Sequence, residues 1–382
     1  MFSIFRFLQW SVVRWAVVVL SHFAIENAAA DEWRVISELP TQRAEFATAV
    51  VDGKIYLIGG TLFEHARGVE RPEFRPGIWR GPFGMSLVEV YDPQTNTWQR
   101  LADIPTPRSE PMTAVVDGKI YVLAGYVGKD NLLVNIKHLK VVEMYDPQTD
   151  TWIRKQDMPT PRTQFGIGVV AGKIYAIGGY VHPRNRKPDE PWRLDLVETY
   201  DPATDTWAKR AKMPTRRDGF GAEVVRETIY AIGGSGWPHD GQGGPALANI
   251  EAYHPKTNRW QKKPDMPNLR WVFSTVVVAE KIYLIGGTDL QAGDRRLAPV
   301  EAFDPVTEKW RVISVAPAVR LPFSIAAVNG NIYIFGGKTE DRELSPIVEV
   351  FDTGFRNVEA RGKLPTRWGQ LKAEYHGQSQ KD

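Results

Sequence analysis

The sequence predicts an all-β chain that folds as a six-bladed β-propeller with four antiparallel strands per blade, and recurring patterns carry this prediction. A glycine pair ends an apolar stretch in five places, and Ala124-Gly125 takes its place in a sixth. An Ile-Tyr pair begins four residues before each of these, an arginine stands twelve residues before each isoleucine, and a tryptophan stands ten residues before each arginine. A fixed period of this kind is the signature of a repeat architecture. The six tryptophans are Trp33, Trp98, Trp152, Trp207, Trp260 and Trp310.

Each unit is predicted to contain four strands, A to D, in chain order. In the first unit residues 46–51 form strand A and residues 55–58 form strand B, with a tight turn at Asp52-Gly53 between them. Residues 88–91 form strand C, and a polar turn leads to strand D, which Trp98 begins. Strands A and B are apolar on both faces, which suits a sheet covered on each side by a neighbouring sheet. Repeats of about 40 to 50 residues with four strands are typical of propeller blades.

The ring is expected to close through an N-terminal strand. Six tryptophan-bearing D strands exist only when Trp33 is counted, because residues 351–360 lack the tryptophan. We therefore expect residues 33–39 to supply strand D of the last blade. The predicted organisation is a signal peptide over residues 1–30, a propeller over residues 31–360 and a C-terminal tail over residues 361–382.

The first 30 residues predict export to the periplasm or secretion. Arg6 and Arg14 form a positive region, residues 15–25 form an apolar run, and Ala28–Ala30 provide small residues for cleavage before Asp31. The alternative is an uncleaved membrane anchor. The apolar run is shorter than the roughly 20 residues that span a bilayer, which favours cleavage. No membrane span is expected after cleavage.

The composition narrows the classes of function. The 48 basic and 45 acidic residues are spread along the chain, so the basic stripe of a nucleic-acid-binding protein is missing. The absence of cysteine excludes disulfides, thiolate metal sites and thiol nucleophiles. No cofactor is expected, and the chain is expected to be a monomer.

The motifs resemble those of the Kelch repeat. Besides the glycine pair and the strand-D tryptophan, Val-Glu-x-Tyr-Asp-Pro recurs at residues 88–93, 142–147 and 197–202. The resemblance extends from residue 33 to about residue 351 and implies the propeller fold. It leaves the activity open, because Kelch-like propellers serve as enzymes, scaffolds and receptors. Among exported bacterial-type members, the chain has a distant similarity to sialic acid mutarotases, which use a glutamate and an arginine near the pore to interconvert anomers.

The B–C and D–A loops share one face of a propeller, and this face is predicted to carry the function. The B–C loops run about 27, 16, 17, 15, 12 and 10 residues, whereas the A–B and C–D turns hardly vary. Constant strands with variable loops are a usual way to mount a binding site. Aromatic rings in these loops are expected to contact a ligand or to fold back and hold the loops. The candidates are Trp79, Trp192, Trp237 and Trp271.

Two interpretations of the repeated arginines remain open. They are predicted to bind ligand as a ring of guanidinium groups around the channel mouth, or to form ion pairs with the strand-C glutamates that hold the blades together. A residue present in every blade favours the second interpretation. The arginines are Arg43, Arg108, Arg162, Arg217, Arg270 and Arg320. The glutamates are Glu89, Glu143, Glu198, Glu251, Glu301 and Glu349.

Residues that differ between copies are the better candidates for chemistry. Glu45 and Glu110 follow their arginines by two positions, Asp218 follows Arg217 directly, and Arg216 is an additional base. These four are expected to place unpaired charge near the pore and are the candidate catalytic residues.

No metal site is expected. His65, His182 and His239 lie in three different B–C loops, but their spacing matches no metal-binding motif.

Two functions follow from these observations. The first is a binding module that presents its loop face to a protein or a glycan. The alternative is a mutarotase or epimerase for a sugar acid of the N-acetylneuraminate type, with Glu45 or Glu110 acting with an adjacent arginine at the mouth of the pore.

Overall fold

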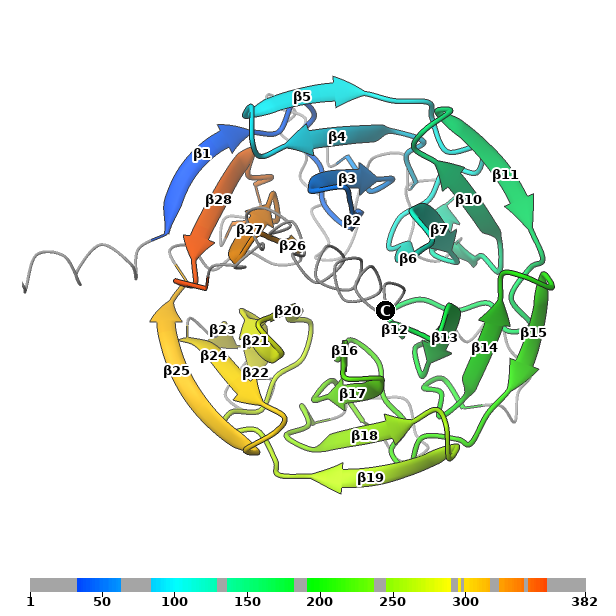
Figure 1. Cartoon of the computed structure of the whole chain (residues 1–382), viewed down its shortest axis with the longest axis vertical. Helices are drawn as coiled ribbons and strands as arrows, with labels where there is room; N and C mark the ends of the chain where they lie inside the picture. The colour runs from blue at the N-terminus through cyan, green and yellow to red at the C-terminus, as the bar shows by residue number, and fades with distance from the viewer. Residues whose placement is uncertain are drawn as a thin grey trace, which may run out of the picture.

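The computed structural model shows six four-stranded sheets arranged in a ring (Figure 1). Every regular element that it describes is a β-strand. The residues it describes are 33–62, 84–128, 136–181, 191–236, 245–289, 295–296, 299–316, 323–339 and 343–355.

The blades follow one another along the chain. The first contains β2 (Ala47–Val51), β3 (Lys54–Ile58), β4 (Val88–Asp92) and β5 (Thr97–Arg100). The second contains β6 (Met112–Val116), β7 (Lys119–Leu123), β10 (Val142–Asp146) and β11 (Thr151–Lys155). The third contains β12 (Gly166–Val170), β13 (Lys173–Ile177), β14 (Val197–Asp201) and β15 (Thr206–Lys209).

The second half of the ring repeats this pattern. The fourth blade contains β16 (Gly221–Val225), β17 (Thr228–Ile232), β18 (Ile250–His254) and β19 (Arg259–Lys263). The fifth contains β20 (Ser274–Val278), β21 (Lys281–Ile285), β24 (Pro299–Asp304) and β25 (Lys309–Val315). The sixth contains β26 (Ser324–Val328), β27 (Asn331–Phe335), β28 (Ile347–Asp352) and β1 (Arg34–Glu38).

The predicted closure of the ring is confirmed. Strand β1 pairs antiparallel with β28, with Arg34 opposite Val350 and Glu38 opposite Ile347, and completes the sheet β1-β28-β27-β26. The sixth blade therefore joins strands from both ends of the propeller (Figure 1).

The repeated tryptophan fastens the outer edge of one blade to the preceding one. Trp152 Nε1 donates to the carbonyl of Ala102 at 3.0 Å. In the C–D turn of the same blade, the Asp150 carboxylate accepts from the Tyr145 hydroxyl at 2.6 Å and from the Ala102 amide at 2.9 Å. Trp207 makes the equivalent bond to the carbonyl of Gln156 at 3.1 Å. Trp98 and Trp260 also donate to the preceding blade, whereas Trp33 Nε1 and Trp310 Nε1 have no hydrogen-bond partner among the described residues. The fixed spacing thus follows from a contact that four of the six blades make.

The hydrophobic core lies between the blades. The buried side chains form six clusters, each built from the facing sheets of two neighbours. In one of them Ala114 and Val116 of the second blade pack with Phe165 and Ile174 of the third. This arrangement explains why strands A and B are apolar on both faces.

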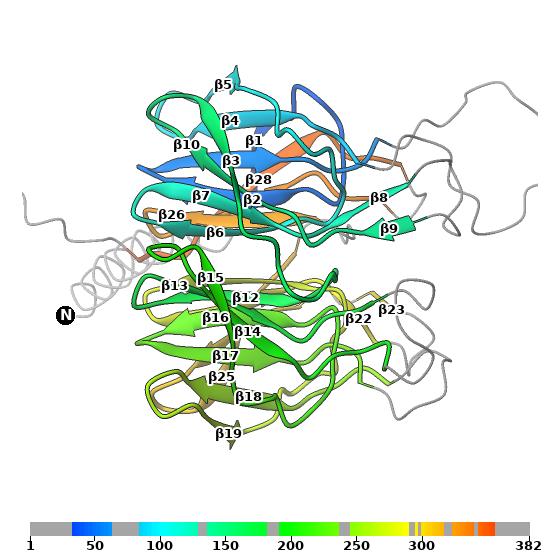
Figure 2. The same ribbon diagram turned by 90° about the vertical axis from the view of Figure 1, so that its right-hand side faces the viewer.

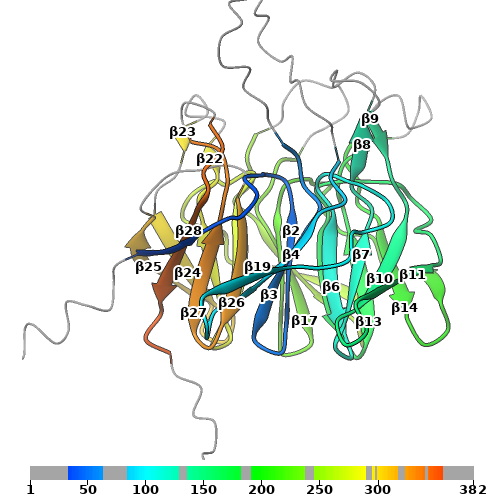
Figure 3. The ribbon, with the colours of Figure 1, turned by 90° about the horizontal axis from the view of Figure 1, so that it is seen from above.

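The two faces of the ring differ. Tight A–B turns occupy one face; in the first, Asp52 and Gly53 both have positive φ, at 50° and 73°. Two ribbons project from the opposite face, β8 (Tyr126–Gly128) with β9 (Ile136–His138), and β22 (Thr288–Asp289) with β23 (Arg295–Arg296) (Figures 2 and 3). We call this second face the loop face.

Candidate functional site

The five arginines within the described ranges form buried ion pairs. Each has zero exposure and pairs with the strand-C glutamate of its own blade. The Nη1–Oε2 distance is 2.5 Å for Arg43 and Glu89, and Arg217 Nη2 lies 2.8 Å from Glu251 Oε2. The remaining pairs are Arg108–Glu143, Arg162–Glu198 and Arg270–Glu301.

Three of these arginines also bind the first glycine of the pair, whereas Arg108 binds Ala124 in the equivalent place and Arg43 donates to the Leu57 carbonyl. Arg162 Nη1 donates to the Gly178 carbonyl at 3.0 Å, and Arg217 Nη1 donates to the Gly233 carbonyl at 2.8 Å. Burial lowers the pKa of Arg217 to about 10, and the nearby Glu251 carboxylate opposes that shift. Arginine, glutamate and glycine pair are thus one structural unit. The described arginines are architectural in this structure, and Arg320 lies outside the described residues.

The second residue after each arginine lies on the rim of the channel mouth. Glu45, Glu110, Gln164, Gly219 and Val272 occupy this position, and all five have positive φ, between 46° and 58°. Backbone bonds join neighbours on the rim: Glu110 donates to the Glu45 carbonyl at 2.8 Å, and Val272 donates to the Gly219 carbonyl at 3.0 Å. A positive φ is costly for valine, so the whole rim is held by its surroundings.

Glu45 is the acceptor at the centre of a polar cluster. The Tyr126 hydroxyl donates to Glu45 Oε2 at 2.7 Å, and the Thr61 hydroxyl donates to the same oxygen at 3.2 Å. Lys338 Nζ lies 3.5 Å from Glu45 Oε1. These partners come from the first, second and sixth blades.

Glu110 stands beside Glu45 and differs from it in environment. Gln164 Nε2 donates to Glu110 Oε1 at 3.3 Å. Burial raises the pKa of Glu110 to about 7, and the charge of Glu45 adds to this effect. Hydrogen bonding to Gln164 and the charge of Lys338 oppose it. Glu110 therefore keeps its proton to a higher pH than an ordinary carboxyl group, beside an acceptor carboxylate.

The other two candidates for catalysis do not carry unpaired charge. Asp218 is buried, and its Oδ2 lies 3.0 Å from Arg193 Nε. Burial raises the pKa of Asp218, while Arg193 opposes the shift. Arg216 Nε lies 3.3 Å from Asp195 Oδ2. The expectation of free charge at Asp218 and Arg216 is wrong. Both form ion pairs, with Arg193 and Asp195 of the third blade's B–C loop.

The predicted aromatic contacts are only partly described. Trp271 is partly buried over the rim, where a Cβ on Gly219 would lie 2.6 Å from Trp271 Nε1. Trp192 is also partly buried, and its carbonyl accepts from Val181 at 2.9 Å. Trp79 and Trp237 lie outside the described residues.

The rim surrounds a mouth cavity of about 210 Å³. Glu45, Glu110 and Gln164 line one side, and Gly219 and Val272 line the other. Below them the residues at the start of strand A form a hydrophobic collar, and these are Phe46, Pro111, Phe165, Phe220, Phe273 and Phe323. The mouth is thus polar on blades one to three and apolar on blades four and five.

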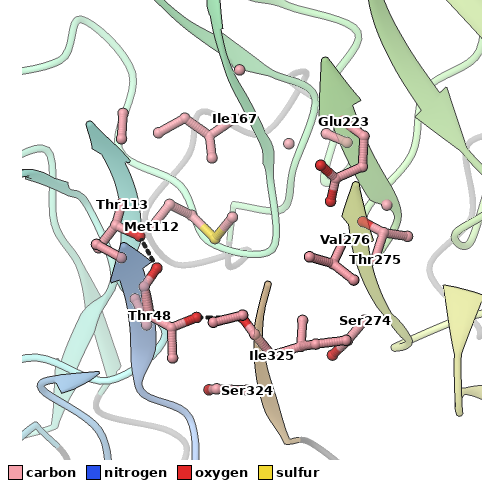
Figure 4. Close-up of a pocket in the computed structure, with 18 of the residues that line it drawn as sticks. Thr48, Met112, Thr113, Ile167, Glu223, Ser274, Thr275, Val276, Ser324 and Ile325 are labelled. Atoms are coloured by element: carbon pink, nitrogen blue, oxygen red, sulfur yellow. Dashed lines mark hydrogen bonds between the residues drawn. The ribbon is translucent and has the colours of Figure 1, made fainter. Parts of the chain in front are cut away.

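Beneath the collar the channel widens into a cavity of about 630 Å³ lined by all six A strands. Figure 4 shows Glu223 reaching into this space beside Thr275, opposite a wall that contains Met112 and Ile167. Burial raises the pKa of Glu223 to about 7, and hydrogen bonding to Thr275 opposes the shift.

Glu223 was not among the residues predicted from the sequence, although a signal was present. It interrupts the apolar strand A of the fourth blade. The equivalent positions of the other blades hold Ala49, Ala114, Gly168, Val276 and Ala326. A position-by-position comparison of the six copies would have revealed it.

Two negative findings apply to the described ranges alone. They contain no group of three His, Asp or Glu side chains placed to hold a metal, and His65, His182 and His239 lie outside them. They also contain no helix with the length and apolarity to cross a membrane.

The repeated ring of four-stranded blades defines the protein as a six-bladed β-propeller. Comparison with known proteins identifies the repeat, and the chain is a Kelch-repeat propeller. The model of the KLHDC2/KLHL20/DRC7 Kelch-repeats domain matches residues 154–337, and the Kelch motif matches residues 107–159.

Similar proteins support the same assignment. Kelch-like protein 36 of Bos taurus is 31% identical over 198 residues, which cover 52% of this chain and 30% of that protein. Kelch-like protein 35 of Mus musculus is 26% identical over 68% of this chain and 38% of its own length. The chain therefore spans about a third of the length of these relatives. The structure of YjhT superposes with a TM-score of 0.66 over 82% of this chain and 96% of its own, at 16% identity, which shows the fold alone.

Proposed function

We propose that this propeller is an exported binding protein that takes its ligand at the mouth of the channel on the loop face. The observation that carries the proposal is the asymmetry of the rim. Glu45, Glu110 and Gln164 gather polar groups on one side of the mouth, whereas the same positions hold Gly219 and Val272 on the other. A ring that needed these groups for stability would repeat them in every blade.

The charge of the mouth favours a neutral, hydroxyl-rich ligand such as a glycan over an anionic one. Two carboxylates lie in the mouth, and the nearby cation, Lys338, is already 3.5 Å from Glu45. A ligand carboxylate would lie beside Glu45 and disfavour ionisation of Glu110, while Lys338 is already paired with Glu45. A sugar hydroxyl can donate to Glu45 and accept from protonated Glu110, and an apolar sugar face suits the collar.

Binding is tested by thermal shift with a panel of neutral glycans, sugar acids and peptides. We expect a neutral glycan to raise the melting temperature, since a ligand that binds the folded state stabilises it. Glu110→Gln should weaken this shift. Glu280→Gln is the matched control, because Glu280 is exposed and pairs with Arg226 far from the mouth on the A–B turn face. No shift with any glycan, together with capture of a partner by the wild type and not by Glu110→Gln, would assign the mouth to a protein ligand.

A second candidate function, the interconversion of sugar anomers, is favoured by one observation. Glu110, with a pKa of about 7, stands beside an acceptor carboxylate. Glu45 would take the proton of the anomeric hydroxyl while Glu110 gives a proton to the ring oxygen, which opens the ring. Closure on the other face of the carbonyl reverses both transfers. Lys338 takes the place of the arginine that the sugar-acid alternative assumed.

This activity is measured by NMR exchange between the anomers of N-acetylneuraminate and of neutral hexoses. We expect faster exchange with the wild type for the neutral sugars and loss of that acceleration in Glu110→Gln. A rate equal to the spontaneous one for every sugar removes the enzymatic candidate and leaves the binding proposal standing.

Export is also part of the proposal. It is supported by the residues that precede the propeller, with Arg6 and Arg14 before an apolar run and alanines at 28–30. N-terminal sequencing of the protein recovered from outside the cytoplasm should begin at Asp31. Recovery of the full chain from the cytoplasm alone would contradict export.

A further inference from the structure

The channel below the mouth contains a carboxylate that the proposed function does not use. Glu223 is the one charged side chain among the described residues that line the cavity of about 630 Å³. Among the described residues, no Lys, Arg or His forms an ion pair with it. A desolvated carboxylate without a counter-ion is costly, and the surrounding wall offers it only hydrogen bonding to Thr275.

The elements packed around Glu223 add little that could neutralise it. Tyr230 stands opposite Glu223 in the β16–β17 pair and is the titratable residue of β17. Strand β12 on one side and strand β20 on the other contribute no titratable residue. Strand β21 also contacts β16 and carries Lys281 and Tyr283, and neither of them shifts the pKa of Glu223. An ionised Glu223 therefore makes the channel negative.

The wall of the cavity is largely aliphatic, with hydroxyl groups at intervals. Ile167, Val224 and Ile325 line it together with threonines. The hydroxyl protons are already used between blades, since Thr48 Oγ1 donates to the Ile325 carbonyl at 2.6 Å and Thr113 Oγ1 donates to the Thr48 carbonyl at 2.6 Å (Figure 4). Their oxygens can still accept a hydrogen bond. The wall thus offers acceptors and apolar surface, and no free donor from these two threonines.

We propose that the channel binds a primary alkylammonium ion, with its ammonium group on the carboxylate of Glu223 and its alkyl chain along the aliphatic wall. This site lies below the mouth and does not depend on the proposed function there. A divalent metal is disfavoured because a single carboxylate is too few ligands for it. An anion would be repelled, and an uncharged apolar molecule would leave the carboxylate unpaired. The ammonium comes either from a free amine or from the lysine side chain of a partner.

The proposal predicts a pH dependence. The amine stays charged below its pKa of roughly 10, whereas Glu223 ionises as pH rises through about 7. Binding should therefore strengthen with pH. Between pH 5.5 and pH 8 the ionised fraction of Glu223 rises about 30-fold, and the affinity should rise by a similar factor.

The test is calorimetric titration of the mature protein with n-hexylammonium chloride and, as an uncharged match, n-hexanol. We expect hexylammonium to bind at pH 8 at least tenfold more tightly than hexanol, and the difference to vanish at pH 5.5. Glu223→Gln keeps the size of the side chain and should lose at least tenfold in hexylammonium affinity at pH 8. Glu110→Gln and the exposed control Glu280→Gln should stay within twofold of wild type.

Two outcomes would overturn the proposal: equal binding of amine and alcohol, or unchanged binding of the amine in Glu223→Gln. Unchanged binding in Glu223→Gln together with loss in Glu110→Gln would place the amine at the mouth. Circular dichroism and the variant's own melting temperature establish that Glu223→Gln is folded. In the wild type, ¹³C NMR of the Glu223 carboxyl should show its pKa falling when hexylammonium is added.

Tighter binding of an acetylated Gly-Lys-Gly peptide than of hexylammonium assigns the site to a lysine side chain, and the reverse order assigns it to a free amine.

Discussion

Replacing Glu223 with glutamine should make the propeller more stable at pH 8 and change the way its stability depends on pH. Burial in the channel raises the pKa of Glu223 from its ordinary value of 4.5 to about 7. Between pH 4.5 and about pH 7 the folded state therefore keeps the proton of the Glu223 carboxyl, whereas the unfolded chain has released it. The contribution of protonated Glu223 to the free energy of unfolding is complete below about pH 4.5. It is lost as pH rises through about 7.

The size of the effect follows from the difference between the two pKa values. It corresponds to ~3 kcal/mol at pH 8, as an upper value, because solvent in the channel relieves part of the cost of the buried charge. Glutamine has the shape of the protonated acid and no charge to bury. We therefore expect Glu223→Gln to exceed the wild type by ~2–3 kcal/mol at pH 8 and to differ by less than ~1 kcal/mol at pH 5.

The assay is urea unfolding followed by tryptophan fluorescence, at pH 5 and pH 8, for wild type, Glu223→Gln and the control Glu280→Gln. Glu280 is the right control because it is exposed on the A–B turn face and already paired with Arg226. Glu110 also has a pKa of about 7, so part of the pH slope will remain in Glu223→Gln. The reasoning is refuted if the gap between Glu223→Gln and wild type is the same at both pH values, or if the variant is the less stable protein at pH 8.

Three further predictions concern the ring itself. Arg162→Ala should cost ~3–5 kcal/mol in urea unfolding, because it leaves Glu198 buried without its partner; a loss below ~1 kcal/mol would contradict the structural role of the pair. Gly221→Val should cost ~1–3 kcal/mol, because a Cβ there would lie 2.4 Å from Thr275 Cγ2 on the next blade; an unchanged melting temperature would show that the blades separate easily. Deleting residues 33–39 removes β1 from the sixth blade, and limited proteolysis should then cut β28 first; protection equal to that of the intact chain would count against closure by β1.

The fold could be predicted because the repeated residues make contacts that recur in most of the blades. Trp152 reaches the carbonyl of Ala102 on the preceding blade, and Asp150 holds the turn that positions it. Contacts of this kind depend on spacing within one repeat, and spacing is visible in a sequence. The pairing of β1 with β28 was predictable for the same reason, since a missing tryptophan at one end matched an additional one at the other.

The candidate site could be predicted only in part. Glu45 and Glu110 stood out because their positions differ between copies, and the structure places them side by side on the rim. Lys338 and Tyr126 were not connected with them, because those contacts join side chains of different blades. Asp218 was misjudged for the same reason, since its partner Arg193 comes from another blade.

The energetics of burial explain why residues repeated in the blades are structural, whereas residues that differ between blades are the candidates for binding. A guanidinium with zero exposure, such as that of Arg162, must be paired and hydrogen-bonded within its own blade, so the arginine, its glutamate and the glycine carbonyl are required together. No such requirement acts on the rim or on the channel wall, where Glu110 and Glu223 bear the cost of burial as raised pKa values instead of forming pairs. This cost does not stabilise the fold. A ligand that accepts a proton at Glu110, or that places a cation beside Glu223, would recover the lost free energy. The carboxyl groups that destabilise the ring are therefore the ones at which binding has the most free energy to gain.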